Sequence, residues 1–518
     1  MRRAAFLILF VVVLGLPYVM KLAVGGRSVA KKAVVAGAER LVIVTPHVGD
    51  IRREFEAAFR QWHVAKYGTE VDLDFRVPGG SNDVKRLLDN VYRGYRDAEG
   101  RLPADVPVDL HVVWGGGDYF VDQELKPLGI LQPLKIDPKL LAEAFPQPTL
   151  AGVKLYDLSK DKAGRPAPQW VGVCLSSFGI VYNPDLYRTL QLPEPKQWRD
   201  LTNEKLAGLV ALADPSHSAS AALAYLMVVQ RAMADAEEAF FGANPAMKSM
   251  PRAELARNAE YQKAIAQGWK QGMKTLVVIA ANARYFTYVS SFVPSDVGNG
   301  QAAAGMAIDF YGRVYQESVG AGRCKFITPA AATAITPDPV AVLYGVKGRQ
   351  EELANHFVEF LLSPEGQRLW ILKAGKPGGP RERSLRRLPV RQDVYADRRG
   401  WTDDENPFAQ AGGFNQRAEW MGWFADMRAI WMAAWIDNRE ALKAAYEKAL
   451  QVEDSRKRAE LIDRLSDLPV TMSDVAELRV KRKEAEAAGK GDEWKAASRI
   501  QWEEKFRRHY EAVAATAE

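Results

Sequence analysis

The chain has 518 residues, too many for a single hydrophobic core, so we expect two or three domains. Hydrophobic residues make up 47% and charged residues 26%, the balance of an ordinary globular protein. The formal charge of +6 is small for this length and gives no indication of nucleic-acid binding.

Residues 1–30 have the features of an export signal. Two arginines precede an apolar run over 4–20, and a small-x-small cleavage site follows at 28–30. Lys21 and Arg27 interrupt the approach to that site, so an uncleaved membrane anchor is the alternative interpretation. In either case we expect a periplasmic or extracellular protein, and in the second case one tethered to the inner membrane.

Residues 40–120 alternate between strand-like and helix-like segments. Buried strands end at the loops TPHVGD (45–50), PGGS (78–81) and WGGGD (114–118), and helical spacing follows the first two. This order is typical of a parallel sheet with helices on its faces. Ligands bind at the carboxyl ends of such strands, so we expect the three loops on one rim.

A second α/β region begins near residue 169. WVGVCLSSFGIVYNP (170–184) predicts paired strands, and LAGLVALADPSHSAS (206–220) predicts a strand and a loop before a long helix. QAAAGMAIDFYGRVY (301–315) predicts a further strand. Beyond residue 420 helix formers dominate, and residues 479–512 predict a solvated helical hairpin.

Three ordered motifs carry a family resemblance. Residues 170–220 resemble the signature of type 2 extracellular solute-binding proteins of ABC importers, with Tyr182-Asn183 and Asp214-Pro215-Ser216 at the expected places. LLSPEGQRLW (361–370) is similar to a late helix of that family. VGNGQAAAGMAIDFYGR (297–313) is similar to the cleft strand of the ferric-ion and organophosphate-binding branch.

The resemblance implies a two-lobed α/β fold, the type 2 periplasmic-binding-protein-like fold, closing about a hinge. It places lobe one at 40–165 with a return at 326–390, and lobe two at 166–325. Residues 391–518 are not explained by the family and are expected to form a helical C-terminal extension. It also places Cys174 and Cys324 at the hinge crossovers, where a disulfide and two buried free thiols remain alternatives.

The strand-end loops and cleft segments supply the candidate ligand-binding residues. Histidine can ligate a metal or donate to an oxyanion, glycines allow close backbone approach, and a serine before a helix offers a hydroxyl beside free N–H groups. Ser81 and Asp118 also suit simple helix capping, which needs no ligand. The candidates are His47, Gly80, Ser81, Gly116, Gly117, Asp118, Ser177, Ser216, Ser218, Asp309 and Tyr311.

The stretch ADPSHSASAALAY (213–225) gathers hydroxyls just before a helix. Ser216 or Ser218 can cap that helix, and the remaining hydroxyls and N–H groups suit an anionic or polar group. A hydrolase using Ser218 and His217 is disfavoured, because neighbouring side chains at a helix start point in different directions. The sequence carries no G-x-S-x-G or HExxH motif and no zinc spacing, so we do not expect an enzyme.

The sequence does not identify the ligand. The resemblance implies an iron-binding tyrosine pair where this chain has Phe310-Tyr311, so only Tyr311, with His47 and Asp309, is left for Fe(III). A phosphorylated compound or a sugar is the alternative, and no cofactor is required. Expected partners are the solute and ABC permease subunits, without nucleic acid, for a monomeric protein. A membrane-anchored ligand sensor or scaffold that uses the helical tail is the rival function.

Overall fold

The computed structural model describes residues 38–410, 414 and 416–517. The predicted export signal or anchor at 1–30 lies outside these residues. Among the described residues no helix combines the length and the apolar character needed to cross a membrane.

The first sheet has seven strands in the order β14-β7-β13-β3-β1-β2, with β4 paired to β13. Strands β1, β2 and β3 are parallel, as the alternating sequence pattern predicted. A hydrophobic core packs this sheet against helices that include α2, whose Phe55 and Phe59 are fully buried. The strands are β1 (Glu39–Val44), β2 (Val71–Arg76), β3 (Val112–Trp114), β4 (Leu131–Gln132), β7 (Trp170–Ser176), β13 (Thr336–Leu343) and β14 (Leu388–Pro389), and the helices are α2 (Gly49–Tyr67), α3 (Ser81–Arg93), α4 (Pro138–Ala144), α11 (Gly348–Leu362) and α12 (Pro364–Ile371).

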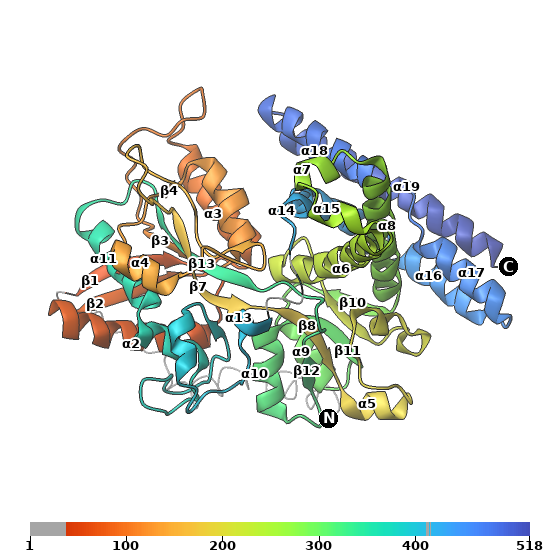
Figure 1. The fold of residues 1–518 in the computed structure, drawn as a ribbon, viewed down its shortest axis with the longest axis horizontal. Helices are drawn as coiled ribbons and strands as arrows, with labels where there is room; N and C mark the ends of the chain where they lie inside the picture. The colour runs from red at the N-terminus through yellow and green to blue at the C-terminus, as the bar shows by residue number, and fades with distance from the viewer. Residues whose placement is uncertain (1–37, 411–413, 415, 518) are drawn as a thin grey trace, which may run out of the picture.

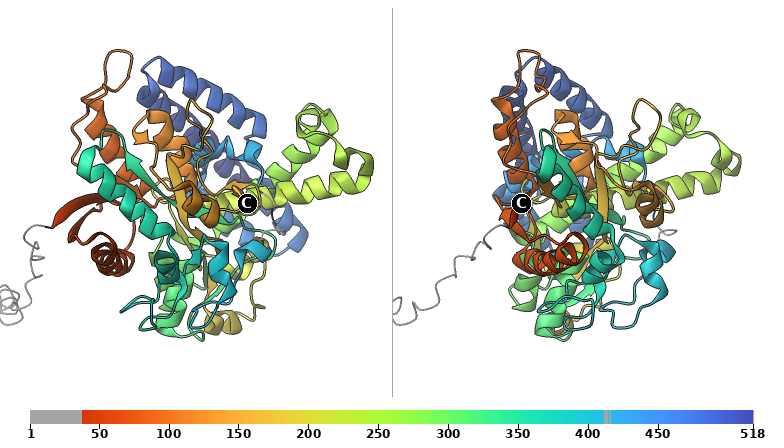
Figure 2. Two further views of the ribbon diagram at one scale, coloured as in Figure 1. Left: turned by 60° about the vertical axis from the view of Figure 1, so that its left-hand side comes forward. Right: turned by 90° about the vertical axis from the view of Figure 1, so that its left-hand side faces the viewer.

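The second sheet has five strands in the order β10-β9-β11-β8-β12. Its long helices α6 and α8 pack on each other, and the segment that joins them projects from the body of the molecule (Figure 2). The strands are β8 (Phe178–Tyr182), β9 (Val210–Ala213), β10 (Ala283–Thr287), β11 (Ala304–Ile308) and β12 (Lys325–Ile327), and the helices are α5 (Pro184–Thr189), α6 (Ala219–Ala243), α7 (Arg252–Leu255), α8 (Ala259–Ala281), α9 (Phe292–Gly298) and α10 (Asp309–Val319). A separate small hairpin consists of β5 (Thr149–Leu150) and β6 (Val153–Lys154).

The chain passes between the sheets at two crossovers. Only Ser177 separates β7 in the first sheet from β8 in the second, and residues 328–335 join β12 to β13 (Figure 1). The predicted pairing of strands within 170–184 is therefore wrong, since β7 pairs with β13 and β14 and β8 pairs with β11 and β12. This single apolar run therefore supplies one strand to each sheet, and both strands are buried along their whole length. The two bodies, called lobe one and lobe two below, carry the first and second sheet.

The cysteines do not form the disulfide that was one alternative. Cys174 lies in β7 of lobe one and Cys324 lies just before β12 of lobe two. Both are buried free thiols.

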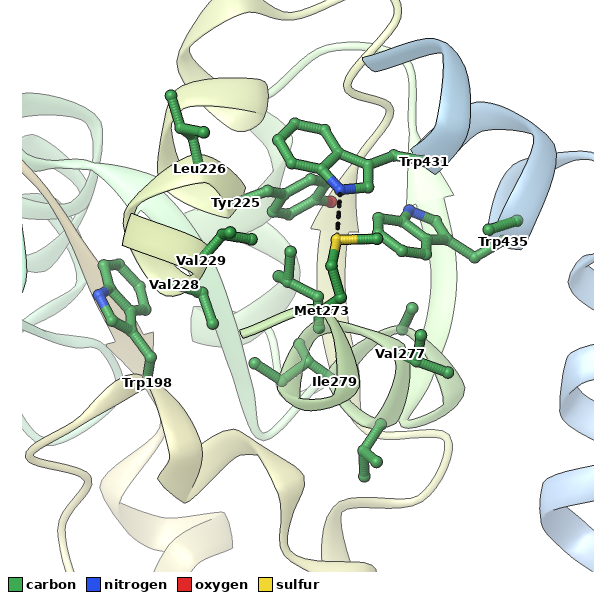
Figure 3. Packing of buried hydrophobic residues seen from close by; sticks show 14 of the residues in the cluster. Trp198, Tyr225, Leu226, Val228, Val229, Met273, Val277, Ile279, Trp431 and Trp435 are labelled. Atoms are coloured by element: carbon green, nitrogen blue, oxygen red, sulfur yellow. Dashed lines mark hydrogen bonds between the residues drawn. The ribbon is translucent and has the colours of Figure 1, made fainter. Parts of the chain in front are cut away.

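The C-terminal region is helical, as predicted, and packs on lobe two (Figure 1). Trp431 and Trp435 lie against Tyr225 of α6, and the Trp431 indole N–H donates to the sulfur of Met273 in α8 at 3.5 Å (Figure 3). The expected hairpin is α18 with α19, which is largely exposed but anchored by buried Phe506, Tyr510 and Val513. The helices are α13 (Pro407–Gln410), α14 (Ala418–Met421), α15 (Phe424–Trp431), α16 (Arg439–Gln451), α17 (Ser455–Ser466), α18 (Met472–Ala487) and α19 (Gly491–Thr516).

Candidate functional site

A cavity of about 370 Å³ lies between the two lobes. Its lobe-one wall comes from the loops after β1, β2 and β3, and its lobe-two wall comes from the start of α6, the loop after β10 and the end of β11. The loops meet closely: Ser81 Oγ donates to the Gly116 carbonyl at 3.3 Å, and a Cβ on Gly115 would lie 2.8 Å from His47 Nε2. The cavity is the cleft of a two-lobed fold.

The structure brings seven of the eleven candidate residues to the cavity wall and leaves four away from it. On the wall are His47, Gly80, Ser81, Gly116, Gly117, Ser218 and Tyr311. Away from it are Asp118, Ser177, Ser216 and Asp309.

The four outlying residues have structural partners or face elsewhere. Asp309 is fully buried at the crossover, where its Oδ2 accepts from the backbone N–H of Ser177 at 2.9 Å. Ser216 donates to Asp214 within its own turn at 2.6 Å. Asp118 faces a second, larger cavity of about 1150 Å³ between lobe one and the C-terminal helices, where burial raises its pKa to about 7.

A buried ion pair forms the floor of the cleft. Arg387 donates from Nη1 to Asp338 Oδ2 at 2.6 Å and from Nη2 to Ser176 Oγ at 2.7 Å. The backbone N–H of Gly117 donates to Asp338 Oδ1 at 3.1 Å. Burial alone raises the pKa of Asp338, but Arg387 and His47 outweigh it and lower the pKa below its ordinary value. The floor is thus a fixed, fully charged pair.

His47 is an uncharged polar group beside that pair. Its ring packs edge-on against Trp114 with centroids 4.5 Å apart, and its Nε2 lies 3.7 Å from Asp338 Oδ2. Burial, reinforced by Arg387 and Arg52, lowers its pKa to about 4 despite the carboxylate. Among the described residues the buried Nε2 has no hydrogen-bond partner.

Helices from both lobes begin at the cavity. The first residues or N-caps of α2, α3, α6 and α10 all line it. Ser218 caps α6 by accepting from the Ala221 N–H at 3.2 Å, and it contacts Ser220 at 3.0 Å. Helix N-termini carry partial positive charge and free N–H groups. Arg52 lies on the cavity wall, and Arg387, paired with Asp338, lies below.

Of the three residues considered for iron, His47 and Tyr311 line the cavity and Asp309 does not. Burial raises the pKa of the Tyr311 phenol to about 12. Asp309 is engaged at the crossover, as described above. Within the described ranges no group of three or more His, Cys, Asp or Glu side chains is placed to hold a metal ion.

Sequence reasoning missed part of the site. Arg52, Asp338 and Arg387 carry its charge, and Ser176, Tyr288 and Ser290 add polar surface. Asp338 had a usable signal, since it is the one charged residue of the apolar strand TPDPVAVL. Arg387 had none, because it lies in a Gly-, Pro- and Arg-rich stretch that is typical of a linker.

Comparison with known proteins agrees with this architecture. Residues 129–382 match the family model of bacterial extracellular solute-binding proteins, which confirms the family predicted from the sequence. Two α/β lobes, paired crossovers and a cleft between them accompany this match, and a helical C-terminal region lies beyond it.

Individual relatives are distant. The chain is 25% identical over 199 residues to the phosphoglycerate transport regulatory protein PgtC of Salmonella typhimurium, a match that covers 38% of this chain and 40% of that protein. Among solved structures, the fructose-6-phosphate-bound periplasmic binding protein AfuA from Actinobacillus pleuropneumoniae aligns with 18% identity and a TM-score of 0.48, covering 69% of this chain and 86% of that one. Iron-bound HitA from Pseudomonas aeruginosa aligns with 16% identity and a TM-score of 0.44, covering 72% and 92%.

Proposed function

We propose that the protein is an extracytoplasmic receptor that captures one small solute with an anionic group and delivers it to an ABC importer. The observation that carries this proposal is the cleft itself, where helix N-termini from both lobes and the buried Arg387 face one cavity. A solute that touches both walls favours lobe closure, because its contacts are complete only in the closed state. The permease subunits are then the partners that receive the closed form.

The proposal assigns no catalysis. Ser218 Oγ is used to cap α6, and the His217 ring lies tilted against Tyr288 with 4.0 Å between centroids. A nucleophile needs a hydrogen-bonded base, and these two side chains have other partners. Binding and release of an unchanged solute fits this arrangement.

Native mass spectrometry of the purified protein tests the proposal. The probes are 2- and 3-phosphoglycerate, fructose 6-phosphate, inorganic phosphate, glucose and ferric ion. We expect a single stoichiometric adduct with at least one phosphorylated compound. Binding of glucose or iron alone, or of none of the probes, contradicts an anionic solute.

A second candidate function is ligand sensing that controls transport. It is favoured by the C-terminal helix α15, which contacts both rims of the cleft, and by the word regulatory in the name of the Salmonella relative. A strain that lacks the protein separates the two. Lost solute uptake supports the receptor, and retained uptake with lost solute-dependent gene expression supports the sensor.

A further inference from the structure

Helix α15 of the C-terminal region reaches both lobes through one side chain. Arg428 donates from Nε to the Pro215 carbonyl at 3.0 Å and from Nη2 to the Ser216 carbonyl at 3.2 Å. Its Nη1 lies 3.5 Å from Glu124 Oε1. The two carbonyls belong to the lobe-two loop that leads to Ser218, and Glu124 belongs to lobe one.

The lobe-one contacts of α15 lie directly after the glycines of the cleft wall. Glu124 is part of a π-helical turn, Phe120–Leu125, that follows Gly116 and Gly117. Tyr119 at the start of this turn packs edge-on against Phe424 of α15, with ring centroids 4.6 Å apart. Helix α15 therefore contacts, in each lobe, the segment that is next in sequence to the cleft wall.

The ion pair is well shielded from water. The side chains of Arg428 and Glu124 are 11% and 14% exposed. At such low exposure a charge pair interacts more strongly than at the surface, and hydrogen bonds from a charged donor are stronger than neutral ones. The Ser216 carbonyl also accepts from the Asn82 side chain of α3, so lobe one, lobe two and α15 meet at this oxygen.

Helix α15 is fixed to lobe two rather than to lobe one. Phe424, Met427, Ile430 and Trp431 are buried in the same hydrophobic cluster as α6 and α8. Opening of the lobes would then carry α15 away from lobe one and break the contacts of Arg428 with Glu124 and of Phe424 with Tyr119.

We propose that Arg428 is a positioning residue for solute binding. It holds the loop before α6 in place and, through Glu124, stabilises the closed arrangement of the lobes. The family match ends at residue 382, so this contact is a contribution of the C-terminal region. The inference rests on the proposed function, because the loop that Arg428 holds carries Ser218 of the cleft.

Electron-paramagnetic-resonance distance measurement on the full-length protein, without solute, tests the inference. Nitroxide labels are placed at exposed Arg93 of α3 and Arg188 of α5, one on each lobe, each replaced by cysteine. We expect Arg428→Gln to raise the ratio of longer to shorter interlobe distances about tenfold, as the loss of hydrogen bonds from a charged donor predicts. Glu124→Gln should shift the ratio in the same direction, and the double variant should add little to Arg428→Gln.

The matched control is Arg439→Gln. Arg439 is another arginine of the C-terminal region, but its contacts are with the Arg284 carbonyl of lobe two and with neighbouring Glu440. It should leave the distances unchanged. Wild-type distances in both Arg428→Gln and Glu124→Gln would overturn the inference, as would an equal shift in Arg439→Gln.

The solute probes are then added separately to the unlabelled wild-type protein and to Arg428→Gln. An adduct that forms with the wild type and weakens in the variant supports both proposals. Shifted distances without any adduct remove the proposed function and leave the effect of Arg428 on the lobes. Unshifted distances with a normal adduct remove the role of Arg428 and leave the proposed function.

Discussion

Arg387 and Asp338 set the chemistry of the cleft at the scale of single residues. Both are nearly fully buried, and Arg387 also lies 4.4 Å from the centre of the Phe310 ring. A buried charge is tolerated when its partner and hydrogen bonds are in place, and it becomes costly when one partner is removed. The pair therefore fixes two opposite charges at the floor of the cleft, and the stability of lobe one depends on both being present.

Arg387→Met removes the cation and keeps the apolar stem. We expect the free energy of unfolding to fall by about 3–5 kcal/mol, because Asp338 is left buried and unpaired. The double variant Arg387→Met with Asp338→Asn should recover part of that loss, since asparagine can still accept from the Gly117 N–H. Urea denaturation measures all the proteins, and simply additive losses in the double variant would count against a coupled pair.

His47 gives a pH dependence with a definite sign. Its pKa of about 4 in the folded protein lies below the ordinary 6.5, so the unfolded chain binds the proton more readily. The stability from neutral His47 is complete above pH 6.5 and is lost as the pH falls toward 4, with a total of about 3 kcal/mol.

His47→Gln removes this titrating group. The variant should lose stability less steeply than the wild type between pH 6.5 and 4, as measured by urea denaturation at several pH values. At pH 8, where His47 is neutral, the difference in the free energy of unfolding between the two proteins gives the packing cost of the substitution alone. Parallel stability curves for the two proteins would exclude His47 as the source. Asp338, Arg387 and Arg52 surround position 47 in both proteins.

Some of these residues could be predicted from the sequence and others could not. His47 was predictable because it follows a buried strand and precedes a helix, a position that a parallel sheet places at its ligand-binding edge. Arg387 was not, because it comes from a distant loop whose placement beside Asp338 depends on the tertiary fold. Asp309 was predicted to lie in the cleft, but its side chain points to the crossover. The side chain of the first residue of a helix can point in more than one direction, and the sequence does not show which.

At the scale of elements, the opposed N-termini of α3 and α6 define how closely the lobes approach. Gly80, the N-cap of α3, is so close to lobe two that a Cβ on it would lie 2.8 Å from the His217 carbonyl. Its backbone, with φ −74° and ψ −177°, is open to any residue. A side chain here would act through the contact between lobes rather than through backbone strain.

Gly80→Ala should therefore oppose lobe closure. We expect weaker solute binding, with the melting temperature changed only slightly, because the added methyl group meets a carbonyl of the other lobe. Calorimetric titration with the probe found by mass spectrometry measures the effect. Gly94→Ala at the other end of α3 is the control, since a Cβ there meets nothing within 4 Å. Equal affinities of the two variants would show that the contact does not limit closure.

The elements themselves were largely predictable, but their pairing was not. The parallel order of β1, β2 and β3 follows from alternating strands and helices. The strands β7 and β8 were expected to pair, and one fully buried apolar run gives no signal of the change of sheet at Ser177. Pairing of strands is decided by partners that are more than a hundred residues away, such as β13 for β7.

At the scale of the whole molecule, the C-terminal helices are part of the body of lobe two. Their aromatic residues share one hydrophobic cluster with α6 and α8 (Figure 3). The sequence predicted the helices but treated them as an extension, because the apolar face of a helix does not reveal its partner. Removal of the region would expose that cluster, so single substitutions are the better test of its role.

Trp431→Ala should destabilise lobe two and the C-terminal helices together. Trp431 is fully buried, and loss of such a side chain costs about 3–5 kcal/mol. Thermal unfolding followed by circular dichroism should show one transition at lower temperature. Trp494→Ala, at a partly exposed position on α19, is the control and should have a much smaller effect. Separate melting of the C-terminal helices in Trp431→Ala would contradict a shared core.

The central claim is that one solute is held between the lobes, and hydrogen–deuterium exchange with and without the bound probe tests it most directly. The account predicts simultaneous protection of both walls, at residues 45–52, 79–84 and 115–119 of lobe one and 214–223 of lobe two. Protection of one wall alone, or only of segments around the larger cavity beside the C-terminal helices, would contradict it.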